Sequence, residues 1–303
     1  MTNNAVALNE HGQPSSWGIN YKRNKEKALK ALQGILSGIQ ADKRLNPTEV
    51  LFLDTWLKTD SAFKKDGDFL DLRDLIEDVL EDGVIEEHEL TEIKSLIKDV
   101  LHYGFMDDWE TDGLINQLLG FLQGITADDS INDKEINALH KMLKYHNEVL
   151  TTWPGDVIHK RLNKILADGI VDDVERQELL SMLKSICGQH FTDTGCAECF
   201  ATDYFSDDLT LDSISGLQIC FTGKFFAGNR KSVESLAKEY GANVCSSINK
   251  QLDLLVIGSM ASRDWIYTNH GRKIEAVINN RQSGSLTKII TEQAWFELID
   301  KQL

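Results

Sequence analysis

The segment GIQADKRLNPTEV at residues 38–50 recurs 86 positions later as GITADDSINDKEI at residues 124–136. Both copies have the same residue types at equivalent positions, namely Gly, Ala-Asp, an aliphatic residue, Asn and Glu. The same offset carries the turn DGVIEEHE, residues 82–89, onto DGIVDDVE, residues 168–175. A fixed offset without a gap over such a length is typical of an internal repeat. The chain therefore contains two copies of one unit.

Apolar residues in each copy recur with the spacing of an α-helix. In the first copy, the positions that form one apolar face are Leu32, Ile35, Leu36 and Ile39. Further apolar positions coincide at the same offset, namely Leu72, Ile76 and Leu80 with Ile158, Leu162 and Leu166. We expect a duplicated all-α bundle, with a polar tail over residues 1–27, a first repeat over 28–105 and a second over 106–190.

The acidic turns of the repeat have the chemistry of helix ends. Asn46 stands at an N-cap position and Glu49 three residues later, which is the pattern of a capping box. A calcium-binding EF-hand loop is the alternative, and it needs Gly at position six and Glu at position twelve. A loop that begins at Asp128 has Asp133 and Leu139 there. We therefore interpret these acids as helix caps.

These acid-Gly turns between short amphipathic helices resemble the TerB-like helical domains of bacteria, which are associated with tellurite resistance. The resemblance rests on the pattern within each repeat. It implies a compact helical bundle that serves as a scaffold beside other modules. It implies no catalytic residues.

Charge divides the chain into two parts. The net charge is −16, yet from Asp212 onward 11 Lys and Arg stand against 9 Asp and Glu, which gives +2 there and −18 in the remainder. An acidic surface repels DNA at long range, so any nucleic-acid contact is expected in the C-terminal part. The acidic helical repeats are the expected site for a protein partner, and a merely solubilising acidic surface is the alternative.

A cysteine-bearing segment follows the helices, at the start of an expected linker over residues 191–211. Cys187 and His190 form a C-x2-H pair, and Cys196 and Cys199 form a C-x2-C pair. Together they have the ligand types of a structural zinc site. Only five residues separate the pairs, which is short for a zinc ribbon. The alternative is that Cys187 ends a helix while Cys196 and Cys199 lie in a loop.

The chain carries no signal for export or membrane insertion. Residues 1–8, MTNNAVAL, have neither a basic flank nor an apolar core. No apolar run reaches the roughly 18–20 residues that a transmembrane helix needs. The 5 cysteines are an odd number, which is poor material for a disulfide framework. These features favour a cytoplasmic protein without a membrane partner.

From residue 217 the pattern changes to short strands that alternate with helices. Strands are expected near 218–222, after the turn at 241–242, at 252–257 and at 287–290. Helices are expected over 229–240, 271–280 and 292–303. Strands that alternate with helices predict a small α/β domain with a four-stranded parallel sheet.

Landmark residues of this segment resemble the BRCT domain over 212–303, about 30% of the chain. Phe221-Thr222-Gly223 stands where that family ends its first strand, and Lys273 begins its second helix. Trp295 takes the position of the tryptophan buried under the third helix. The stretch from Ser262 to Glu275 looks closest to the BRCT modules of bacterial NAD-dependent DNA ligases and replication exonucleases. Ala242 departs from the usual second glycine of the turn.

The resemblance implies a phosphate pocket. Thr222 offers a hydroxyl, Gly223 a backbone N–H, and Lys273 a charge at the start of a helix. Lys224 and Arg230 would extend a basic rim toward a nucleic-acid backbone. Such a pocket suits the 5′-phosphate of a DNA end or a phosphorylated protein. The alternative is that Thr222 and Gly223 only shape a turn and that Lys273 is a solvated surface residue.

Two tryptophans of this module receive different roles. Trp265 lies in a loop and could stack on a base, with the filling of a hydrophobic gap as the alternative. Trp295 is assigned to the core.

No nucleophile–base set, P-loop or dinucleotide fingerprint is present, so we do not expect an enzyme. The sequence favours an adaptor that binds DNA ends or nicks through its BRCT-like module and recruits proteins through its helical repeats, in bacterial DNA repair or defence. A scaffold that binds only proteins, phosphorylated or not, is the alternative.

Overall fold

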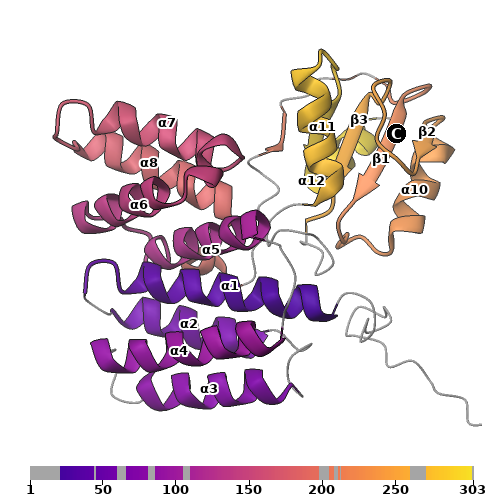
Figure 1. Ribbon diagram of the computed structural model, residues 1–303. Coiled ribbons are helices and arrows are strands. Elements are labelled where there is room, and N and C mark those ends of the chain that lie inside the picture. Colours follow the sequence, from indigo (N-terminus) through magenta and orange to yellow (C-terminus); the bar gives the residue numbers. More distant parts are fainter. Residues whose placement is uncertain are drawn as a thin grey trace, which may run out of the picture. The chain divides into compact units, whose positions relative to one another are not determined.

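The computed structural model describes residues 21–43, 46–59, 66–80, 86–104, 110–197, 205–207, 211, 213–259 and 271–301. These residues form twelve α-helices, one 3-10 helix and four strands (Figure 1). The predicted fold class, a helical region followed by an α/β part with a four-stranded parallel sheet, is confirmed. None of the described helices combines the length and the apolarity that a membrane crossing requires.

The chain divides into two units. The first holds α1 (Tyr21–Ile39), α2 (Pro47–Thr59), α3 (Gly67–Leu80), α4 (Glu87–Gly104), α5 (Glu110–Ile125), α6 (Asp133–Tyr145), the 3-10 helix η1 (Asn147–Thr151) and α9 (Phe191–Thr194). The second holds α7 (Gly155–Ile165) from Asp156 onward, α8 (Asp173–Cys187) and the elements of the sheet. The predicted boundaries of the tail, the two repeats and the linker stay predictions.

The bounds of the helices follow the repeat seen in the sequence. A shift of 86 positions carries α2 from Pro47–Thr59 onto α6 at Asp133–Tyr145, and carries the end of α1 at Ile39 onto the end of α5 at Ile125. The first residue of α4 falls on the first residue of α8 in the same way. Both copies thus place helix ends at equivalent residues, because equivalent caps begin them.

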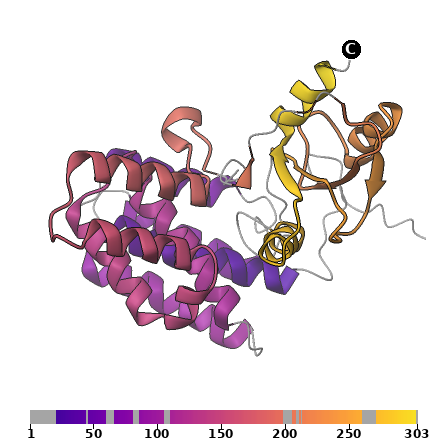
Figure 2. The ribbon, with the colours of Figure 1, turned by 90° about the horizontal axis from the view of Figure 1, so that it is seen from above.

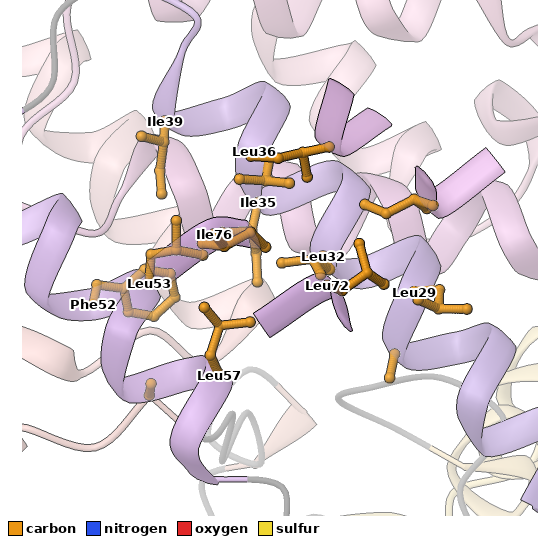
Figure 3. Close-up of a cluster of buried hydrophobic side chains, with 14 of the residues drawn as sticks. Leu29, Leu32, Ile35, Leu36, Ile39, Phe52, Leu53, Leu57, Leu72 and Ile76 are labelled. Carbon is orange, nitrogen blue, oxygen red and sulfur yellow. The ribbon is translucent and has the colours of Figure 1, made fainter. Parts of the chain in front are cut away.

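The core of the first unit is built from the apolar faces of α1 to α4 (Figure 3). Leu32 and Ile35 of α1, Phe52 and Leu53 of α2, and Ile76 of α3 are all fully buried. This confirms the apolar face predicted for residues 32–39. Phe191 of α9 joins the same core, where its ring meets that of Phe52 edge-on with 5.4 Å between centroids.

Helices α1 and α5 lie side by side and cross at four glycines (Figure 1). Gly34 and Gly38 of α1 are equivalent to Gly120 and Gly124 of α5 in the repeat. A Cβ atom on Gly34 would lie 2.1 Å from the carbonyl oxygen of Gln117, and one on Gly120 would lie 2.1 Å from that of Ala31. A Cβ on Gly38 would lie 3.0 Å from the Cα of Gly124, and the reverse distance is also 3.0 Å. Only glycine lets the two backbones approach this closely.

The two copies also exchange hydrogen bonds across this crossing. Asn46 donates its side-chain amide to Asp128 over 2.8 Å, and Asn132 donates to Asp42 over 3.2 Å. The two bonds are related by the repeat offset, so each copy gives and receives the same interaction. Such reciprocity is what a twofold axis produces between identical surfaces. Two copies of the repeated segment therefore meet here as the halves of a symmetric pair.

The sheet of the second unit consists of β1 (Gln218–Thr222), β2 (Asn243–Cys245), β3 (Leu254–Ile257) and β4 (Lys288–Thr291). All neighbouring strands are parallel, in the order β2-β1-β3-β4. Helix α10 (Arg230–Glu239) connects β1 to β2, and α11 (Arg272–Gln282) connects β3 to β4. Helix α12 (Glu292–Asp300) follows β4. The strands and helices predicted from residue 217 onward are all present, with bounds that differ by a few residues.

Each face of the sheet has its own set of buried residues. Phe221 and Val256 pack with residues of α10 and α12, among them Trp295, whose ring meets Phe221 edge-on at 5.3 Å. Alternate residues such as Leu255 point to the other face, and Ile274 of α11 is fully buried. Figure 2 shows α11 (gold) and α12 (yellow) on opposite sides of the sheet. The core role predicted for Trp295 is confirmed.

The segment predicted as a linker is attached to the folded parts wherever it is described. Ala197 belongs to the core of the first unit, as Phe191 does. Asp207 accepts the backbone N–H of Ile289 over 2.6 Å, and its own N–H donates to the Ile289 carbonyl over 2.7 Å. Asp207 also forms an ion pair with Arg281 of α11. Asp207 thereby extends the hydrogen bonding of the sheet beyond β4.

Candidate functional site

The topology of the sheet singles out one place for ligand binding. The chain leaves β1 toward β2 on one side and continues in β3 on the other side of β1. In open α/β sheets, ligands bind outside the carboxyl ends of the strands at such a switch point. Here that point lies between the end of β1 at Thr222 and the end of β3 at Ile257.

Thr222 and Gly223 form the turn that leaves β1. Thr222 is the last residue of the strand and is 5% exposed, and its carbonyl accepts the N–H of Gly258 over 2.9 Å. Gly223 has a φ of +85°, a left-handed backbone conformation that residues other than glycine rarely adopt. The chain turns sharply beside the end of β3 as a result.

Lys273 reaches the same turn from α11. Its ammonium donates to the carbonyl of Phe221 over 3.1 Å and lies 3.2 Å from Sγ of Cys220. Both acceptors belong to the last residues of β1, so the charge sits directly before Thr222. Gly271, the N-cap of α11, contributes no side-chain cap. An ammonium has three donors, which leaves capacity for an anion.

Arg230 and Lys224 complete the set predicted around this turn. The guanidinium of Arg230, the first residue of α10, donates to the carbonyl of Gly223 over 3.3 Å. Lys224 follows Gly223 directly, and a Cβ on Gly258 would lie 2.1 Å from its carbonyl oxygen, so its backbone lies against the end of β3. The structure thus gathers all five predicted residues at the switch point. Whether they bind phosphate stays a prediction.

Sequence reasoning missed Glu292, a buried carboxylate at the same edge. Its exposed fraction is 4%, and it is the first residue of α12. It accepts the N–H groups of Phe226 over 3.1 Å, Ala227 over 2.9 Å and Ser259 over 2.9 Å. These bonds tie the loop after β1 to the loop after β3. An acid in the first turn of a helix is ordinarily interpreted as a charge near the positive end of the helix, so the sequence held no distinct signal for this role.

Trp265, proposed as a base-stacking residue, lies outside the described residues, and so does Cys199 of the proposed zinc set.

Three members of the proposed zinc set, Cys187, His190 and Cys196, lie among the described residues. Cys187 ends α8 and is buried, its thiol facing the Lys184 carbonyl at 3.8 Å, and Gly188 caps the helix in a left-handed conformation. Cys196 is partly exposed. Within the described part of the chain, no three Cys, His, Asp or Glu side chains lie close enough together to hold a metal ion. The zinc set of Cys187, His190, Cys196 and Cys199 therefore stays a prediction.

The acids of the repeat turns act as helix caps where the structure describes them. Asn132 and Glu135 form a capping box at α6, and Asp172 and Glu175 form one at α8. Asn46 accepts the N–H of Glu49 over 3.0 Å, and Glu49 accepts that of Asn46 over 2.9 Å. The interpretation as caps is confirmed for these turns.

Two of the capping acids are buried at the crossing of the repeats. Glu49 is 3% exposed and Glu135 is 4% exposed. Burial, together with the negative charges of Asp128, Glu135 and Asp42, raises the pKa of Glu49 to about 8, against the hydrogen bond from Asn46, which lowers it. Glu49 is consequently protonated in neutral solution.

Comparison with known proteins gives a partial likeness to a DNA ligase. The chain matches no protein-family model and no solved structure. It is 44% identical over 45 residues to a DNA ligase of Nitratidesulfovibrio vulgaris (strain Hildenborough). The match covers 15% of this chain and 6% of that ligase, so it is a local similarity to a much longer protein.

Proposed function

We propose that this protein is a non-enzymatic cytoplasmic adaptor, whose BRCT-like α/β part binds the 5′-phosphate of DNA ends or nicks. The observation that carries the proposal is the ammonium of Lys273, held 3.1 Å from the Phe221 carbonyl beside the Thr222–Gly223 turn. A fixed cation, a hydroxyl and a backbone N–H at a switch point are the groups that hold phosphate in other α/β sheets. The helical repeats, which resemble TerB-like domains, would recruit a repair or defence protein.

The distribution of charge favours a phosphate at an end over a long stretch of duplex. The part from Asp212 onward has a net charge of only +2, and the remainder has −18. A protein that covers many phosphates needs many cations and repels DNA if it is acidic. One terminal phosphate needs only the few groups gathered at the end of β1. The local similarity to a DNA ligase supports a role connected with DNA.

The first test compares 5′-phosphorylated and dephosphorylated duplexes by fluorescence anisotropy in low salt. We expect tighter binding of the phosphorylated duplex by roughly 10- to 100-fold, because a hydrogen bond to a charged group contributes about 1.5–3 kcal/mol. Lys273→Ala should remove most of that preference. Lys250→Ala is the matched control, since this exposed lysine precedes β3 and so lies at the amino edge of the sheet.

Equal affinity for both duplexes, or a preference that survives Lys273→Ala, would contradict the proposal.

The acidity of the helical part favours a second candidate, a scaffold that binds only proteins. Its net charge of −18 suits a basic protein surface better than a nucleic acid. This candidate predicts no DNA binding at low salt. A phosphoserine peptide that binds in a Lys273-dependent manner, while DNA does not bind, would establish the scaffold and exclude the DNA adaptor.

A further inference from the structure

Phe226 is an exposed aromatic residue beside the proposed phosphate site. It is 71% exposed, whereas its neighbour Phe225 is 5% exposed and packs on Phe221 with 6.0 Å between ring centroids. A single exposed apolar residue is ordinary on a protein surface and proves nothing by its exposure. What sets Phe226 apart is the way its backbone is held.

The turn that carries Phe226 is fixed at three points. The backbones of Phe225 and Gly228 form an antiparallel bridge that closes it. The N–H groups of Phe226 and Ala227 donate to the two carboxylate oxygens of Glu292, at 3.1 Å and 2.9 Å. The same carboxylate binds the N–H of Ser259 after β3. A ring presented by so constrained a turn needs little ordering when it binds a partner.

Cations surround this turn in the sequence and at the edge of the sheet. Lys224 precedes Phe226 by two residues, and α10 begins with Arg230 and Lys231 and has no acid in its first turn. Arg230 is bonded to Gly223, directly after Thr222. An aromatic face among cations suits a nucleic acid, because bases stack on the ring while phosphates meet the charges.

We propose that Phe226 stacks on the terminal base of the DNA strand whose 5′-phosphate is held at Thr222, Gly223 and Lys273. This inference rests on the proposed function. It adds a reason why the protein would bind the end of a DNA strand rather than the interior of a duplex. The bases inside an intact duplex are covered by their neighbours, so only an end or an opened nick offers a free base face. Phosphate recognition alone cannot make this distinction as sharply, because every nucleotide carries a phosphate.

The test uses the full chain and a 5′-phosphorylated duplex with 2-aminopurine, a fluorescent base quenched by stacking, at the 5′ terminus. The wild type should quench the probe. Phe226→Ala should abolish the quenching and weaken binding on the order of tenfold, and Phe226→Trp should restore both. Leu286→Ala is the matched control, since it removes another exposed apolar side chain, 90% exposed, that precedes β4 at the amino edge of the sheet.

The outcomes separate this inference from the proposed function. If Phe226→Ala binds and quenches like the wild type while Lys273→Ala loses the preference for the 5′-phosphate, the stacking is overturned and the phosphate site stands. If no variant or duplex shows any preference for the phosphate, both are overturned. Lys273-dependent binding of a phosphoserine peptide with no binding of the duplex would likewise exclude stacking on DNA.

Discussion

The crossing of α1 and α5 and the carboxyl edge of the sheet both concentrate polar residues, but they use them differently. At the crossing, Asn46 and Asn132 donate to the aspartates of the opposite copy, and the buried acids cap helices. At the sheet edge, the cations Lys224, Arg230, Lys231 and Lys273 form no ion pair with any described acid. Among the described residues, the carboxylate buried there is that of Glu292, and it accepts hydrogen bonds from backbone N–H groups.

This difference separates a structural surface from the proposed binding surface. Polar groups at the crossing have found their partners inside the chain, so they hold the repeats together and offer nothing further. Cations at the sheet edge keep part of their bonding capacity, which an anion can satisfy. Substitutions at the crossing should therefore change stability, and substitutions of the cations at the edge should change binding.

The largest expected effect is that of a methyl group at the crossing. In Gly120→Ala, the new Cβ would lie 2.1 Å from the carbonyl oxygen of Ala31, a backbone atom that cannot move without displacing α1. We expect the free energy of unfolding to fall by about 3 kcal/mol or more, because overpacking costs roughly 1–3 kcal/mol even where side chains can adjust. Thermal and urea denaturation of the full chain measure it.

Gly113→Ala on the same helix is the control for this change. Its Cβ would meet only the flexible end of Lys30, at 3.4 Å. The alanine should stabilise α5 by up to about 1 kcal/mol through its better helix propensity. If both variants moved the melting temperature in the same direction, the crossing would not be as tight as described.

A second prediction concerns Glu292, which ties the loop after β1 to the loop after β3. Glu292→Ala leaves the N–H groups of Phe226, Ala227 and Ser259 without their acceptor. We expect the free energy of unfolding to fall by about 2–3 kcal/mol, since some of these groups can bind water instead. Amide hydrogen exchange should become faster at residues 226, 227 and 259. Glu297→Ala, an exposed acid on the same helix, is the control and should leave their exchange unchanged.

Much of this architecture could be predicted from sequence because its causes are local. Helix caps such as Asn132–Glu135 and the apolar run at β3 depend on residues a few positions apart. The offset of 86 predicted which residues of the two copies are equivalent. It did not show that Gly34 and Gly120 face the opposite backbone. That fact depends on how two distant helices cross.

The site was predicted only as far as the family resemblance reached. Thr222, Gly223, Lys224, Arg230 and Lys273 could be named because they follow landmark positions of the strand and helix starts. Glu292 and Phe226 could not, because their roles arise from contacts over more than sixty residues of sequence. A Phe-Phe pair after a strand predicts burial of both rings as readily as exposure of one.

The substitution with the smallest expected effect tests the buried acids of the crossing through pH. The pKa of Glu49 is raised from 4.5 to about 8, so the folded protein holds this proton more tightly than the unfolded chain does. The contribution of Glu49 to the free energy of unfolding is therefore largest below pH 4.5. It falls as the pH rises toward 8, by at most about 1.4 kcal/mol for each pH unit, and is constant above that.

Glu49→Gln removes the titrating group and keeps an oxygen that can accept the N–H of Asn46. We expect urea denaturation to give a flatter dependence on pH between 6 and 8 than the wild type shows, with the variant about 1–2 kcal/mol the more stable at alkaline pH. Glu87→Gln, an exposed change of the same charge in the first turn of α4, controls for the altered net charge. Should Glu49→Gln follow the wild type at every pH, the carboxyl would be ionised in the folded state. The crossing would then hold the negative charge of Glu49 beside the charges of Asp128, Glu135 and Asp42.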